Sequence, residues 1–278
     1  MLKDFSILFK ETWKEYKLKL KLFLKVYFTF SVLIPLALLV IFGGLAAIAY
    51  DYNLMPLVYI FAFLGILAII AVSVIGTAAT IYSALFAKDS KIKLSRVRDN
   101  SIKFFWKYLR LMIIIVLIAL ALVMLVVSSW SLTSLSYWTL LFSIPFTIAL
   151  IIFFVYLAVY WAFSSYILMD ENAKVIFSLR KSFNIVKGKW WRTFGFLILI
   201  GLIVLAAYVV IGILNIFFLP LMILGGKGVI IYYTITNIIR VIATAFISPL
   251  SIIFIKNLYL DMKLFSLKRK IFDKKETL

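Results

Sequence analysis

The sequence predicts an all-α integral membrane protein with six transmembrane helices, arranged as three repeated helix pairs that each follow a basic amphipathic interfacial helix. Of its 278 residues, 65% are hydrophobic and only 15% are charged, which leaves too little polar side chain to cover a soluble domain. The apolar residues gather in six long runs, and basic segments precede the first, third and fifth runs. We therefore expect one polytopic membrane domain over residues 1–278.

The three basic segments share a pattern: a base, six residues, a lysine, two residues and a tryptophan. Its three copies are Lys3, Lys10 and Trp13, then Arg96, Lys103 and Trp106, and finally Arg180, Lys187 and Trp190. Since the chain holds only 7 tryptophans, their recurrence favours an internal repeat. Independent anchoring of three helices at the membrane interface is the alternative. The repeats would cover about 1–88, 89–170 and 171–262, followed by a basic cytoplasmic tail, 263–278.

Each basic segment is predicted to form an amphipathic helix at the membrane surface. The first segment places lysines 3, 10, 14, 17, 21 and 25 on one side of a helix, with aromatic and aliphatic residues on the other. Lys19 falls opposite this stripe. Lysines 17, 19 and 21 also alternate like a strand, but a strand beside lipid would leave backbone groups without partners. The second segment keeps the stripe through Arg96, Lys103, Lys107 and Arg110.

The six expected spans are residues 26–48, 57–87, 111–127, 138–169, 193–218 and 228–260. The second, fourth and sixth are longer than a bilayer about 30 Å thick requires, so we expect them to tilt, protrude or break. Pro145 and Pro249 lie inside the fourth and sixth spans and favour kinks, for packing geometry or as hinges. Small residues that permit close helix approach are Gly76, Ala78, Ala79, Ala158, Ala162, Ala243 and Ala245.

The distribution of charge predicts the orientation. Of the 30 lysines and arginines, all but Lys227 and Arg240 lie in the N-terminal segment, after the second and fourth spans, or between Lys256 and the C-terminus. The positive-inside rule then places both termini in the cytoplasm, with the protein in the cell membrane. Because the bases adjoin apolar runs, the net charge of +19 indicates anionic lipid headgroups rather than nucleic acid as partners.

Three acids follow the even spans and are expected to form local ion pairs or helix caps in cytoplasmic turns. They are Asp89, Asp170 and Asp261, and each is followed by a base within ten residues: Arg96, Arg180 and Lys268, respectively.

The composition also excludes several kinds of chemistry. The chain has no cysteine and no histidine, which excludes disulfides, ordinary zinc sites, haem ligation and histidine acid–base catalysis. No span contains a pair of carboxylates that could form a proton relay. We expect no enzyme activity, no cofactor and no metal.

Arg240 is the residue that needs a special account. A charge inside a span costs at least about 2.5 kcal/mol on insertion scales, and Asn237 lies one helical turn before it. One hypothesis is that both face a polar cavity that holds an anionic group such as a lipid phosphate. The other is that Arg240 pairs with Asp51, Asn215 or helix carbonyls inside the bundle, or extends outward to the interface.

Two short stretches resemble a known family. They are Ser182-Phe183 with Gly188-Lys189-Trp190-Trp191-Arg192-Thr193-Phe194, and Asn257-Leu258-Tyr259-Leu260-Asp261. Together they are similar to the multi-pass membrane domain fused to some bacterial glycerophosphodiester phosphodiesterases, and to its stand-alone relatives. The hydrolase of that family is a separate soluble barrel that needs acidic and histidine residues, so the resemblance implies a membrane protein without an assigned reaction.

Two functions fit these observations. The first is a non-enzymatic scaffold or accessory protein whose basic cytoplasmic collar binds anionic lipids or a membrane or cytoplasmic protein partner. The alternative is a small transporter or lipid-translocating protein with a cavity near Arg240 and with its kinked even helices as moving parts.

Overall fold

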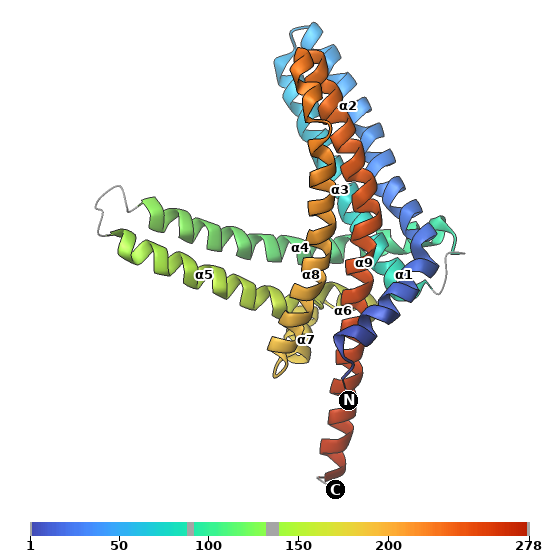
Figure 1. Ribbon diagram of the computed structural model, residues 1–278, viewed down its shortest axis with the longest axis vertical. Coiled ribbons are helices and arrows are strands. Elements are labelled where there is room, and N and C mark those ends of the chain that lie inside the picture. The colour runs from blue at the N-terminus through green and yellow to red at the C-terminus, as the bar shows by residue number, and fades with distance from the viewer. Residues whose placement is uncertain (1, 88–91, 132–138, 277–278) are drawn as a thin grey trace. The chain divides into compact units, whose positions relative to one another are not determined.

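The computed structural model describes residues 2–87, 92–131 and 139–276, and this part of the chain contains helices and no strands (Figure 1). Six helices are long and apolar enough to cross a membrane, as expected for a multi-pass membrane protein. They are Phe5–Asp51, Met55–Phe86, Leu94–Ser131, Leu140–Asp170, Trp190–Ile216 and Gly225–Leu267. Each overlaps one expected span, although Trp138, the expected start of the fourth, lies outside the described residues.

The chain divides into two compact units. The first contains Met1–Phe105 and Phe196–Leu258, and the second contains Trp106–Gly195 and Tyr259–Leu278. Three helices therefore contribute residues to both units. They are α4 (Leu94–Ser131), α8 (Trp190–Ile216) and α9 (Gly225–Glu276).

Two of the three basic segments are continuous with the spans that follow them. Helix α1 (Phe5–Tyr27) passes through a π-helical stretch, η1 (Phe28–Leu33), into α2 (Ile34–Asp51). The π-helical stretch precedes Pro35, whose missing N–H interrupts the regular ladder of backbone hydrogen bonds. Helix α4 likewise holds both the second basic segment and the third span.

The third basic segment is a helix of its own. Helix α7 (Val175–Val186) is separated from α8 (Trp190–Ile216) by a turn in which Gly188 has φ +79°. Glycine adopts this left-handed conformation without the steric penalty that a Cβ brings. The three basic segments therefore join their spans in two different ways.

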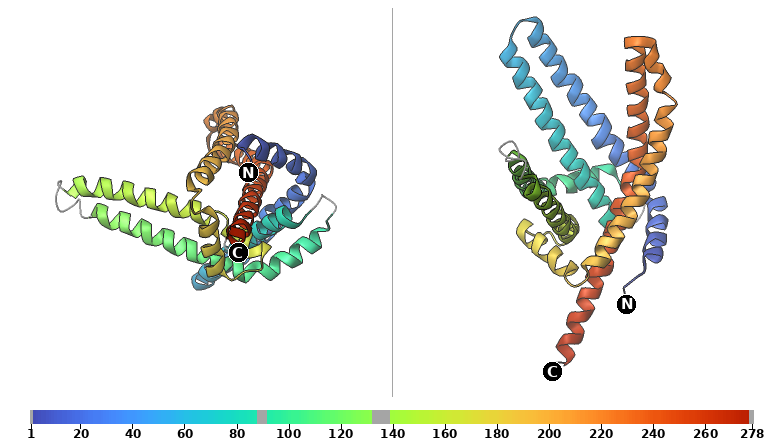
Figure 2. Two further views of the ribbon diagram at one scale, coloured as in Figure 1. Left: turned by 90° about the horizontal axis from the view of Figure 1, so that it is seen from below. Right: turned by 60° about the vertical axis from the view of Figure 1, so that its left-hand side comes forward.

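In the first unit, η1 and α2 pack closely along α3 (Met55–Phe86), and Figures 1 and 2 show α2 beside α3. A Cβ added at Gly76 would lie 2.9 Å from Phe30 Cβ, and one at Gly65 would lie 2.9 Å from Phe42 Cβ. Since real Cβ atoms do not approach so closely, both glycines are needed for this packing. The predicted close approach at Gly76 is confirmed.

The other small residues give mixed results. Ala78, Ala79 and Ala245 are fully buried, as expected for a helix interface. Ala162 and Ala243 are half-buried, whereas Ala158 is exposed, so the predicted close contact through Ala158 is wrong. Ala158 lies on a face of its helix that the described chain does not cover.

The buried core of the first unit lies where the basic segments meet the spans. One cluster joins residues of α1, η1, α3 with its C-cap, and α4: Leu22, Val26, Phe30, Ala79, Ala87 and Val97. Further along the spans, large apolar side chains such as Leu39 and Ile66 are exposed. Exposed apolar surface on long helices is what a hydrocarbon environment favours.

In the second unit, α4 lies beside α5 (Leu140–Trp161), and the two helices are linked by hydrogen bonds (Figures 1 and 2). The Ser143 hydroxyl donates to the Ser129 carbonyl at 2.8 Å, and Trp130 Nε1 donates to Thr147 Oγ1 at 3.1 Å. In the first unit, α8 and α9 are linked similarly, with 3.1 Å between the Tyr208 and Thr244 hydroxyls. A 3₁₀ helix, η4 (Leu219–Leu224), joins α8 to α9.

The fourth expected span is broken, but not at its proline. Pro145 lies inside α5 and Pro249 inside α9, whereas the break falls at Ala162 and Phe163, before α6 (Ser164–Asp170). There the Phe163 N–H donates to Ser182 Oγ at 3.2 Å, and the Ser182 hydroxyl donates to the Tyr160 carbonyl at 2.6 Å. A buried serine of α7 thus satisfies the backbone groups that the break releases.

Candidate functional site

Helix α1 has one basic, exposed face and one buried face. All six lysines of the predicted stripe are exposed: Lys3, Lys10, Lys14, Lys17, Lys21 and Lys25. Lys3 precedes the first residue of α1, so the predicted common side is confirmed for the other five. The opposite side is buried and consists of Leu8, Thr12, Tyr16, Lys19, Leu22, Phe23 and Val26. The helix is therefore amphipathic, and its own chain covers only the face without the stripe.

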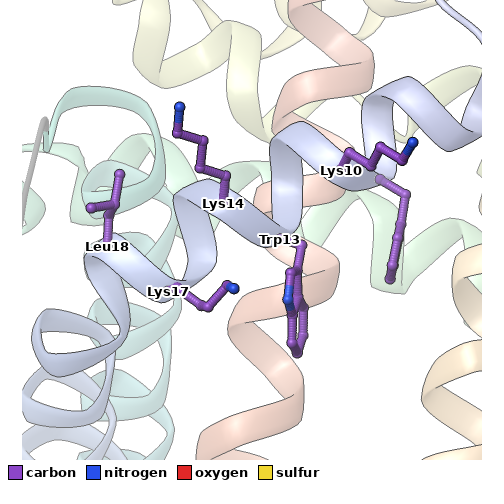
Figure 3. A pocket seen from close by; sticks show the side chains of 6 residues that line it. Lys10, Trp13, Lys14, Lys17 and Leu18 are labelled. Carbon is purple, nitrogen blue, oxygen red and sulfur yellow. The ribbon is translucent and has the colours of Figure 1, made fainter.

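An open groove of about 440 Å³ lies on the exposed face of α1 (Figure 3). It is lined by Phe9, Lys10, Trp13, Lys14, Lys17 and Leu18. The Lys17 ammonium lies 5.8 Å from the centroid of the Trp13 ring, within cation–π range, and Figure 3 shows Lys17 extending toward this ring. The groove therefore offers bases beside an indole, the residue type that favours the headgroup region of a bilayer.

The second and third copies of the pattern also place their bases at the surface. Arg96, Lys103, Arg180 and Lys187 are exposed, and so is Trp106. The environments of the tryptophans differ, because Trp190 is half-buried and its Nε1 donates to the Tyr156 carbonyl at 3.3 Å. The bases are thus equivalent in exposure, whereas the tryptophans are not.

A buried charge cluster fastens α1 to its neighbours in the first unit. The Glu15 carboxylate accepts hydrogen bonds from Lys19 and from Lys256, whose Nζ lies 2.6 and 2.7 Å from the two carboxylate oxygens. The side chains of Lys19 and Lys256 are only 5% and 7% exposed. Lys19 also donates to the Ala84 carbonyl at 3.1 Å. We call Glu15, Lys19 and Lys256 the Glu15 cluster.

Two further hydrogen bonds strengthen the contact between α1 and α9. The Asn257 amide donates to Thr12 Oγ1 at 3.0 Å, and the Tyr16 hydroxyl donates to the Phe246 carbonyl at 3.0 Å. The placement of Lys19 opposite the lysine stripe was the only sequence signal of this contact. Nothing in the sequence singled out Glu15 or Lys256.

The acids of the second unit do not all pair locally. Asp170 accepts from Lys263 at 2.6 Å and from the Tyr259 hydroxyl at 2.8 Å, so the predicted ion pair with Arg180 is wrong. Arg180 is exposed, because α7 turns the face that carries Ser178 and Ser182 inward. Asp89 lies outside the described residues, as does the side chain of Lys268.

Glu171 extends this second cluster. Its carboxylate lies 2.5 Å from Lys181 Nζ and 2.9 Å from Lys263 Nζ. Burial alone would raise the pKa of Glu171, but the hydrogen bonds and charges of Lys181 and Lys263 outweigh burial and lower it. Glu171 therefore stays ionised at neutral pH, and its ion pairs link the end of α6 to α7 and to α9.

The two stretches that carry the family resemblance meet in the second unit. Arg192 of the first stretch forms an ion pair with Asp261 of the second, at 3.3 Å. Phe183 stacks on Tyr160 with 4.1 Å between the ring centroids, next to the break that Ser182 satisfies. The residues that carry the resemblance thus hold helices together, and their contacts suggest a structural role for both stretches.

Arg240 and Asn237 are both exposed on α9. Among the described residues, the Arg240 side chain forms no ion pair, and its carbonyl accepts a hydrogen bond from Thr244 Oγ1 at 2.8 Å. Asp51, one of its suggested partners, is also exposed. An anion site at Arg240 and Asn237, and the transporter function that would use it, stay predictions.

Residues for a metal site do not gather in the described ranges. No group of three or more acidic side chains there is arranged to hold a metal ion. Comparison of the chain with family models, curated proteins and solved structures gives no match. The resemblance to the phosphodiesterase-fused membrane domain therefore stays an expectation.

Proposed function

We propose that this protein is a non-enzymatic scaffold or accessory protein of the cell membrane, and that its basic cytoplasmic collar binds anionic lipid headgroups. The collar consists of the exposed bases and the tryptophans of the three basic segments. The observation that carries the proposal is the exposure of the five stripe lysines within α1, on a helix whose opposite face is buried.

The physical basis is electrostatic. A lysine or arginine near an anionic leaflet contributes about 1 kcal/mol, and the attraction falls off within a Debye length. The Glu15 cluster fixes the rotation of α1, so the five stripe lysines of this helix keep facing away from the chain. A surface of this kind also suits an acidic protein partner, which is the other expected occupant of the collar.

The contacts of the basic segments support three repeated helix pairs. In the first unit, Val97 of α4 belongs to the same buried cluster as Ala87 at the end of α3. In the second unit, Ser182 of α7 bonds to Tyr160 at the end of α5. Each of these two basic segments thus packs against the end of the span that precedes it, as equivalent parts of a repeat would.

The test measures the preference of the protein for anionic lipid. Reconstituted in bilayers of phosphatidylcholine and phosphatidylglycerol, it should select spin-labelled phosphatidylglycerol. We expect the triple variant Lys10→Gln, Lys14→Gln, Lys17→Gln to lower the relative association constant of that lipid at least about threefold. Lys227→Gln, which removes an exposed base on the predicted outer side, is the control and should leave the preference unchanged. An unchanged preference in the triple variant would refute the proposal.

A further inference from the structure

The second unit contains an open groove of about 720 Å³ whose lining combines bases with apolar side chains. Four bases line it: Lys107 and Arg110 of α4, Lys174 at the N-cap of α7, and Arg180 of α7. Ile113 and Ile114 of α4 and Phe177 of α7 are among its apolar residues. The volume lies in the range of pockets that hold a small ligand.

The bases of this groove differ from three other bases of the same unit. Lys181, Lys263 and Arg192 are each paired with a carboxylate. By contrast, no described carboxylate lies within ion-pair distance of Arg110, Lys174 or Arg180, and the lining contains no acid. The groove therefore carries four positive charges without compensation from the described chain.

One of these bases is held in place by a backbone feature. Lys107 Nζ donates to the carbonyl oxygen of Asn172 at 3.1 Å and to its Oδ1 at 2.6 Å. Asn172 adopts a left-handed conformation with φ 49°, which asparagine tolerates better than most residues. Because both bonds are to neutral oxygens, Lys107 keeps its charge available to a ligand.

The arrangement along α4 separates charge from apolar surface. Lys107 and Arg110 come just before the expected third span, and Ile113 and Ile114 come one turn later, inside it. The bases thus lie where the lipid headgroups are expected, and the isoleucines continue toward the hydrocarbon. A soluble polyanion would satisfy the bases but would leave the apolar lining uncovered.

We propose that this groove binds one anionic phospholipid, with its phosphate among Arg110, Lys174 and Arg180 and an acyl chain along Ile113, Ile114 and Phe177. The guanidinium groups of Arg110 and Arg180 can each donate two parallel hydrogen bonds to a phosphate. This inference rests on the proposed function and deepens it, because it turns one part of the collar into a site for a single lipid molecule.

The experiment counts the lipids that stay bound. The protein is reconstituted in phosphatidylcholine–phosphatidylglycerol nanodiscs, released, and weighed by native mass spectrometry. Wild type should retain one phosphatidylglycerol, and the variant Arg110→Gln, Arg180→Gln, Lys174→Gln should retain it at least about tenfold less. The matched variant Lys10→Gln, Lys14→Gln, Lys17→Gln removes the same number of charges from α1 and should keep that lipid. Arg180→Glu alone, which leaves the other bases intact, should also lower retention.

The outcomes separate this inference from the function it rests on. Equal retention in wild type and the groove variant would overturn the site. Equal loss in the groove and α1 variants would also overturn it, but would leave the collar in place. The collar would be refuted as well if both the groove variant and the α1 variant had the same selectivity for spin-labelled phosphatidylglycerol as wild type. Thermal unfolding that matches wild type verifies that each variant is folded.

Discussion

Replacing Glu15 by glutamine is expected to lower the free energy of unfolding by about 3 kcal/mol or more. The Glu15 carboxylate is the acid shared by two buried lysines, Lys19 and Lys256. Glutamine has nearly the same shape but no charge, so both ammonium groups would stay buried without a counter-charge. Removing one partner of a buried ion pair costs far more than removing an exposed pair, because the remaining charge stays out of water.

The matched control lies on the same helix. Glu11 pairs with Lys3 at 2.6 Å, but the two side chains are 46% and 44% exposed. Glu11→Gln should therefore cost less than about 1 kcal/mol. Unfolding of both variants by denaturant in the same detergent gives the comparison. Similar losses for Glu11→Gln and Glu15→Gln would show that the Glu15 cluster does not hold α1 in place.

Ser182→Ala is expected to destabilise the protein by about 2 to 4 kcal/mol, because it leaves two buried backbone groups without a partner. The Phe163 N–H and the Tyr160 carbonyl are both bonded to the Ser182 hydroxyl where the helix breaks. Alanine can replace neither bond. We expect earlier thermal unfolding, and faster hydrogen exchange at Phe163 and its neighbours than in wild type.

Ser178→Ala provides the comparison for this effect. Ser178 is on the same helix and is also fully buried, but its hydroxyl donates to Val175, one turn earlier in α7, at 2.7 Å. Removing the Ser178 hydroxyl breaks no bond between helices and should lower the free energy of unfolding by only about 1 kcal/mol. If Ser178→Ala destabilised the protein as much as Ser182→Ala, the bridge across the break would not be the cause.

The spans and the lysine stripe could be predicted because they depend on local properties. Transfer of a long apolar run into hydrocarbon is favourable whatever its neighbours are, so composition alone indicates six spans. The rotation of α1 follows similarly from helical periodicity, which placed Lys19 opposite the stripe before any contact was known. That position now has a physical reason in the Glu15 cluster.

The ion pairs of Asp170 with Lys263 and of Glu15 with Lys256 could not be predicted, because they join residues far apart in the chain. Asp170 has Arg180 ten residues away, yet it pairs with Lys263, since α7 presents Ser178 and Ser182 inward and leaves Arg180 exposed. The break at Ala162 and Phe163 was missed for the same reason. It depends on a serine from another helix, whereas the expectation relied on Pro145, which α5 accommodates.

The most direct test of the central claim is the sidedness of the basic segments, because a collar can bind anionic lipid only on the leaflet that contains it. The chain has no cysteine, so single cysteines can be introduced without background. Lys14→Cys and Lys187→Cys should react with a membrane-impermeant maleimide only after cells are opened, whereas Tyr52→Cys should react in intact cells. All three positions are exposed. Labelling of Lys14→Cys or Lys187→Cys in intact cells would contradict the cytoplasmic collar.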